Sequence, residues 1–155
     1  MKGRSARRPF TLWLLIILTL LIGISALISG PMLFLEPSGS LVQWSVEDLE
    51  GTPFSDYLIP GIILFVFIGI YPVFVGYSLI RKPAWRWPDA INPAKEQHWA
   101  WAASSSVGII MLIWIIVETV LLGFISFLQP VIAVWAVLIL LLAFLPGVRR
   151  YFRRA

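Results

Sequence analysis

The chain has 155 residues, of which 59% are hydrophobic and 13% are charged, whereas a soluble domain carries roughly 25% charged residues. It has no cysteine, which excludes disulfide exchange, thiol nucleophiles and Cys-ligated zinc or iron–sulfur clusters. The formal net charge is +4. Because the basic residues flank long apolar runs, they favour an anionic lipid surface over nucleic acid as the partner.

Charged residues form blocks between the apolar runs. All 12 Lys and Arg residues lie in the first eight residues, in 81–95 or in 149–154, whereas most of the 8 carboxylates lie in 36–56, which has no basic residue. Basic loops stay in the cytoplasm because Lys and Arg resist translocation. The alternation therefore predicts a multi-pass cell-membrane protein whose N- and C-termini are both cytoplasmic, with anionic lipids at that face.

Four segments are long and apolar enough to cross a hydrocarbon core of about 30 Å, which takes about 20 residues. In chain order they cover about 10–35, 57–80, 99–125 and 130–148. We expect the first to be a retained helix rather than a cleaved signal peptide, because the apolar run is too long and Pro31 directly follows Gly30. The sequence thus predicts an all-α membrane protein, a four-transmembrane-helix bundle that forms one domain over 1–155.

The acidic segment between the first two spans is the predicted outer loop. Ser45 precedes Asp48 by three residues, which is the spacing of a capping box. Together with apolar neighbours such as Trp44 and Leu49, this predicts a short interfacial helix on the outer membrane surface. The carboxylates could bind divalent cations, but a solvated acidic face explains them as well, and we predict no metal site.

The loop between the second and third spans is basic and aromatic. Its tryptophans are Trp85, Trp87, Trp99 and Trp101. This composition is typical of an aromatic belt at a membrane–water boundary, with cations that snorkel. Asn92-Pro93 predicts an N-cap followed by proline at the first helical position, so that the third helix would begin in the cytoplasm. His98, the sole histidine, is expected to be solvated.

Glu118 is the one acid or base inside a predicted span, and such residues usually face a bundle interior or a wet cavity. At about 100° per residue it shares a helix stripe with Ala100, Ser104, Gly108, Met111 and Ile115. Small residues spaced by four let helices approach closely. Glu118 is therefore expected to point into the bundle, either protonated and bonded to neighbouring helices or holding a cation or a ligand amine.

Two groups of residues follow from this placement. Candidate ligand-binding residues at the same pocket are Glu118, Trp114, Trp135, Ser29 and Tyr71. Candidate structural residues are Pro72, Gly69, Gly76, Ser104 and Gly108, because the proline predicts a kink in the second span and the small residues favour close packing.

The sequence contains no nucleophile with its base, no metal-ligand cluster and no phosphate loop, so we predict no enzyme, no catalytic residue and no cofactor. The leading hypothesis is a non-catalytic accessory or scaffold subunit of a membrane complex, with a membrane protein or a second copy as partner. One alternative is a binder or carrier of a lipid, isoprenoid or quinone around Glu118. Another is a proton- or cation-coupled transporter.

In topology the pattern resembles small four-span bacterial inner-membrane proteins, which implies that location and transfers no residue roles. Four-span thiol oxidoreductases and claudin-like proteins share the number of spans, but both need cysteines that this chain lacks.

Overall fold

The computed structural model describes residues 7–155, and this part of the chain is all-helical, with 74% helix and no strand. Helix α1 covers Phe10–Leu35 and α5 covers Trp99–Leu122. Between them, α2 (Leu58–Ile63), the π-helical η3 (Leu64–Ile70) and α3 (Tyr71–Arg81) form one continuous helix. Helix α4 (Arg86–Ala90) is short. Helix α6 (Leu128–Phe144) is followed by α7 (Pro146–Phe152) at a bend of 61°.

Three helices, or four if α6 and α7 count as one broken span, are long and apolar enough to cross a membrane. This is consistent with a multi-pass membrane protein. The predicted spans over 10–35 and 57–80 match α1 and the α2–α3 helix almost residue for residue. Of the predicted N-terminal basic cluster, Lys2 and Arg4 lie outside the described residues.

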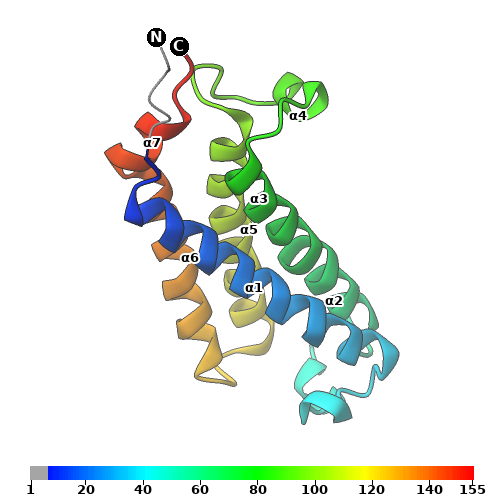
Figure 1. Ribbon diagram of the computed structural model, residues 1–155. Helices are drawn as coiled ribbons and strands as arrows, with labels where there is room; N and C mark the ends of the chain where they lie inside the picture. The colour runs from blue at the N-terminus through cyan, green and yellow to red at the C-terminus, as the bar shows by residue number, and fades with distance from the viewer. Residues whose placement is uncertain (1–6) are drawn as a thin grey trace.

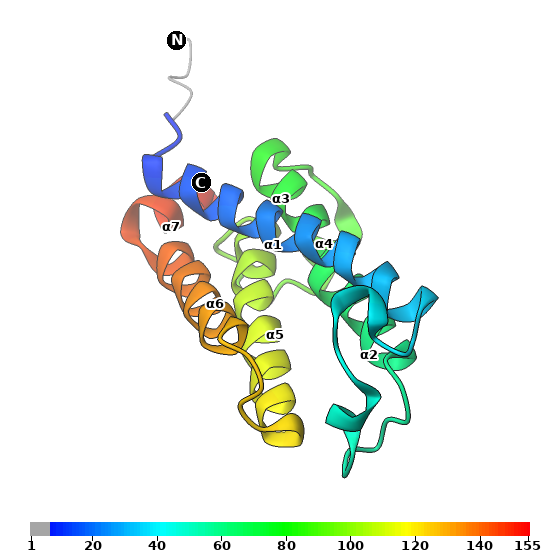
Figure 2. The same ribbon diagram turned by 90° about the horizontal axis from the view of Figure 1, so that it is seen from below.

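The charge blocks are separated along the bundle. Figure 1 shows the start of α1, α4, α7 and the C-terminus at one end, and the loop 36–57 with the α5–α6 turn at the other. The first end, which holds the described Lys and Arg residues, is called the basic end below, and the second the acidic end. Helix α1 crosses the bundle, so that it contacts α6 and α7 as well as α2, η3 and α3, while α5 and α6 run side by side (Figures 1 and 2).

Glycines set the close approach of α1 to the α2–α3 helix. A Cβ added at Gly30 would lie 2.7 Å from the Cβ of Phe65 and 3.1 Å from the carbonyl oxygen of Gly61. A Cβ at Gly23 would lie 2.8 Å from Val73 Cγ2 and 3.1 Å from the carbonyl oxygen of Gly69. These backbones can touch because glycine has no side chain, as in other small-residue helix contacts in membranes.

Pro72 is accommodated without a break in the helix. The seven residues of η3 that precede it are π-helical, and the Tyr71 N–H donates to the carbonyl of Val66, five residues back. This wider turn makes room for the proline ring, which would otherwise collide with the carbonyl four residues earlier. Pro72, where the sequence predicts a kink, therefore directly follows a π-helical segment within one continuous helix.

Two helix ends differ from the sequence prediction. The third span ends at Leu122, not near 125, because Gly123 adopts a φ of 73°, a conformation that favours glycine. The fourth helix runs from Leu128 only to Phe144, not from 130 to 148. Leu145 is extended, with ψ of 139°, because a residue before proline avoids helical geometry, and Pro146 then starts α7.

The start of the third helix also differs. Its N-cap is His98, and α5 begins at Trp99. Asn92 instead closes the preceding loop: its side chain accepts from Ala94 N at 3.0 Å and donates to the Gln97 carbonyl at 3.0 Å. The prediction that Asn92-Pro93 begins a helix was wrong, because this asparagine bonds to a loop that folds back on itself.

The acidic loop 36–57 forms two short 3₁₀ helices, η1 (Ser40–Val42) and η2 (Val46–Leu49). The capping box is confirmed, since Ser45 Oγ accepts from Glu47 N and Asp48 Oδ2 accepts from Ser45 N. Leu49 is 4% exposed and packs with Leu33 and Tyr57. The loop is thus anchored on the end of the bundle.

Candidate functional site

Glu118 lies on α5 close to the turn that joins α5 to α6, and it is partly buried. Its carboxyl group faces the side chains of Trp114 and Gln129. Gln129 also organises the turn, because its Oε1 accepts from Ile125 N at 3.0 Å and its Nε2 donates to the Gly123 carbonyl at 3.0 Å. Within residues 7–155 the one salt bridge joins Arg154 and Asp89, so Glu118 forms none there.

The stripe that carries Glu118 is buried along most of its length. Ala100, Ser104 and Met111 are fully buried, and Ile115 is nearly so. At Gly108 an added Cβ would lie 2.6 Å from Leu140 Cγ, which identifies α6 as the packing partner. The stripe is therefore a contact between α5 and α6, and Glu118 continues it at the acidic end.

The other candidate ligand residues form separate contacts. The hydroxyl groups of Tyr71 and Ser106 lie 2.6 Å apart, and Ser106 is twelve residues from Glu118, or about 18 Å along α5. Trp135 Nε1 donates to the Leu18 carbonyl at 3.1 Å, and Ser29 Oγ donates to the Ser25 carbonyl on its own helix. The structure thus brings Trp114 to Glu118, and uses Tyr71 and Trp135 to join other pairs of helices.

The basic end contains a stack of aromatic rings, which includes three tryptophans of the predicted aromatic belt. The Phe74 ring lies 5.7 Å from Trp85, 6.0 Å from Trp87 and 5.9 Å from Trp99, all within 24° of parallel. Trp99 Nε1 donates to the Pro83 carbonyl at 2.9 Å. The rings therefore hold the segment 82–90, which includes α4, against α3 and α5, and this stack lies beside an open cavity lined by residues 84–87.

The C-terminal tail is bound to the segment before α5. His98 N donates to the Phe152 carbonyl at 2.8 Å, Arg154 N donates to the Glu96 carbonyl at 2.9 Å, and Gln97 forms an antiparallel bridge with Arg153. The Arg154 guanidinium also donates to the carboxylate of Asp89. This hydrogen bond holds the pKa of Asp89 below its usual range.

His98 is half-buried rather than fully solvated. Its Nδ1 accepts from Ala100 N at 3.2 Å and so caps α5. Burial lowers the pKa of His98, and the nearby charges of Lys82 and Arg154 lower it further. The imidazole that caps the helix is therefore the neutral form.

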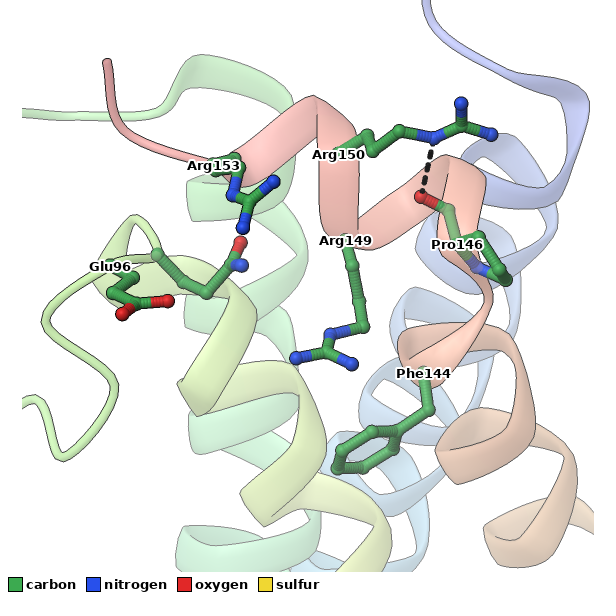
Figure 3. Close-up of a pocket in the computed structure, with 7 residues that line it drawn as sticks. Glu96, Phe144, Pro146, Arg149, Arg150 and Arg153 are labelled. Atoms are coloured by element: carbon green, nitrogen blue, oxygen red, sulfur yellow. Dashed lines mark hydrogen bonds between the residues drawn. The ribbon is translucent and has the colours of Figure 1, made fainter.

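A cavity of about 250 Å³ lies at the basic end, between the 96–97 segment and the bend from α6 to α7. Its lining residues are Glu96, Gln97, Phe144, Pro146, Arg149, Arg150 and Arg153. Figure 3 shows the guanidinium groups of Arg149 and Arg153 pointing into this space, while Arg150 turns away and its Nε donates to the Pro146 carbonyl. Sequence reasoning missed this site, because it requires residues about fifty positions apart to meet.

Among the residues that the structure describes, no group of three or more His, Cys, Asp or Glu side chains could hold a metal ion. Comparisons of the chain with family models, with curated proteins and with solved structures find no match.

Proposed function

We propose that the chain is a non-catalytic multi-pass membrane protein that serves as an accessory or scaffold subunit of a membrane complex. The observation that carries the proposal is how the polar side chains within the helices are used. Tyr71 bonds Ser106 across α3 and α5, and Trp135 bonds the backbone of α1 from α6. Such bonds join helices in lipid, and they use the side chains of Tyr71, Ser106 and Trp135 for packing between helices.

We also propose that the basic end is cytoplasmic, and that the membrane is a bacterial inner membrane. Support comes from the separation of basic and acidic residues to opposite ends of the bundle (Figure 1), combined with the rule that Lys- and Arg-rich loops are not translocated.

Topology can be tested with single cysteines, because the natural chain has none. Ser40→Cys, in the acidic loop, is expected to react with a membrane-impermeant maleimide applied to intact cells or spheroplasts. Ala90→Cys, also exposed but at the basic end, should react only after the membrane is permeabilised. The reverse pattern would refute the proposed orientation.

The accessory role is tested by extracting the protein from its own membrane in a mild detergent. Co-purification with other subunits at a fixed ratio is the expected result, and Glu118→Gln should leave that ratio unchanged. Recovery of the chain only as a free monomer would contradict the proposal.

A second candidate function, binding of a lipophilic ligand beside Glu118, is favoured by one observation. This carboxyl group is partly buried, and it has no salt-bridge partner in the described part of the chain. Under this alternative, lipid extracts of the purified protein would contain a bound compound that Glu118→Ala loses and that Glu36→Ala, on the same end, retains.

A further inference from the structure

We propose that the cavity beneath α7 is a binding site for the headgroup of an anionic phospholipid, with Arg149 and Arg153 on the phosphate. The inference rests on the membrane placement proposed above and goes beyond the accessory role. It stands on three observations: the charge of the cavity, the unpartnered polar atom in its lining, and the apolar surface that continues below it.

The positive charge of the cavity favours an anionic ligand. Three arginines and one carboxylate, Glu96, line it, and even without Arg150, which turns away, the arginines outnumber the carboxylate. None of these arginines forms a salt bridge within residues 7–155. Guanidinium groups match phosphate oxygens in two-point geometry, and Arg149 and Arg153 both point into the cavity (Figure 3).

One hydrogen-bond acceptor in the cavity lining is buried and has no donor among the described residues. Gln97 is 6% exposed and lines the cavity, and its Oε1 has no hydrogen-bond partner. A buried acceptor without a partner is costly. A headgroup that carries hydroxyl groups beside its phosphate, such as glycerol, would donate to Gln97 or to Glu96 while the phosphate meets the arginines.

The surface below the cavity suits acyl chains. Phe144 lines the cavity and is 51% exposed, and along the same helix Leu141 is 59% exposed and Leu138 is 44% exposed. The bend of 61° turns α7 away from the direction of α6, with Val148 and Phe152 buried and Arg149, Arg150 and Arg153 exposed. An amphipathic helix in this setting lies at the membrane–water interface. The headgroup of one lipid would then bind in the cavity while its acyl chains contact the exposed apolar residues of α6.

The test is native mass spectrometry of the full chain released from nanodiscs that contain equal phosphatidylglycerol and phosphatidylcholine. The wild type should retain phosphatidylglycerol selectively. The double variant Arg149→Gln with Arg153→Gln should weaken this retention by about thirtyfold, or about 2 kcal/mol. The control variant Arg81→Gln with Arg86→Gln removes the same charge from exposed positions on the same end but outside this cavity, and should retain the lipid.

Equal loss in both double variants, or loss in neither, would overturn the proposal, as would equal retention of the two lipids by the wild type. Displacement by millimolar inorganic phosphate would show a free-anion site instead of a lipid site. Arg149 also lies over the Trp101 ring, so its substitution could disturb folding. If the double variant fails to fold, Arg153→Gln alone should weaken the retention of phosphatidylglycerol by about fivefold. Extraction of the wild-type chain by alkaline carbonate would refute the membrane placement itself, separately from the site.

Discussion

The guanidinium group of Arg8 joins the beginning of the bundle to its last helix, because its Nε donates to the Tyr151 hydroxyl at 3.3 Å. Its Nη2 donates to the Ile80 carbonyl, at the end of α3, at 2.6 Å. The charge also suits the negative end of that helix dipole. One side chain thus connects the segment just before α1 with α3 and α7.

We expect Arg8→Met to lower the free energy of unfolding by about 1–2 kcal/mol, since hydrogen bonds from a charged group are lost and two acceptors lose a partner. Unfolding in mixed micelles with increasing denaturing detergent measures the effect. Arg7→Met is the matched control, because Arg7 is adjacent and exposed. Equal effects of the two substitutions would show that only net charge matters.

The Gly30–Gly61 contact predicts that the effect of a glycine-to-alanine substitution on stability depends strongly on its position. Gly30→Ala should destabilise the bundle by about 1–3 kcal/mol, because the new methyl group meets the backbone and Cβ of Phe65 and one helix must move. Gly147→Ala should be neutral or slightly stabilising, since its Cβ would lie 3.8 Å from the nearest atom and alanine favours a helix. The melting temperatures of the two variants in one detergent test this difference.

His98 predicts a pH dependence of stability. Its pKa is lowered by burial and by Lys82 and Arg154, so the unfolded chain binds a proton more readily than the folded chain does. The contribution of neutral His98 to the free energy of unfolding is therefore fully present above the ordinary histidine pKa of about 6.5. It is lost as the pH falls through the lowered pKa of His98 in the folded protein.

The measurement is the unfolding free energy at about pH 7.5 and about pH 5, in wild type and in His98→Asn. Asparagine keeps an N-cap but does not titrate in this range, so the variant should show a smaller loss at low pH. His98→Ala should be less stable by about 0.5–2 kcal/mol at the higher pH, because the cap is absent. An identical pH response in wild type and His98→Asn would contradict the role of this imidazole.

Asp89 and Arg154 predict a local titration. Arg154→Gln should raise the pKa of Asp89 toward its ordinary value, because the hydrogen bond that lowers it is removed. Since the folded pKa is depressed, the contribution of this pair is present at neutral pH and disappears on acidification through that lowered pKa. Carbon NMR of the Asp89 carboxyl group reads the shift directly. Arg153→Gln, one residue away, should leave the Asp89 titration unchanged.

The helical spans follow from the sequence because their cause is local. The uncharged run of α1 and the basic and acidic blocks can be read without knowing any distant neighbour. The end of α6 could also have been placed at Phe144, since Pro146 makes helical geometry at Leu145 unfavourable. The predicted end at 148 followed hydropathy alone and ignored that proline.

The contacts of the site could not be read in the same way. Asn92 satisfies the rule for an N-cap, but its bonds to Ala94 and Gln97 depend on a loop that the C-terminal tail holds in place. Tyr71 and Glu118 both suit a polar site within the bundle, but their depths on different helices place them about three turns of α5 apart. Periodicity gives the face of a helix, whereas the register between helices depends on packing.

The early end of α6 has a consequence for the lipid around the protein. Its 17 residues span about 25 Å, whereas the 26 residues of α1 span about 39 Å. Under the membrane placement proposed above, α1 is longer than a hydrocarbon layer of about 30 Å and has to tilt, whereas α6 without α7 is shorter than that layer, so that the bilayer beside it is expected to thin. In that placement the two helices are mismatched to the bilayer in opposite senses, and we expect the protein to partition into thinner bilayers and to collect beside proteins that deform the membrane in the same way.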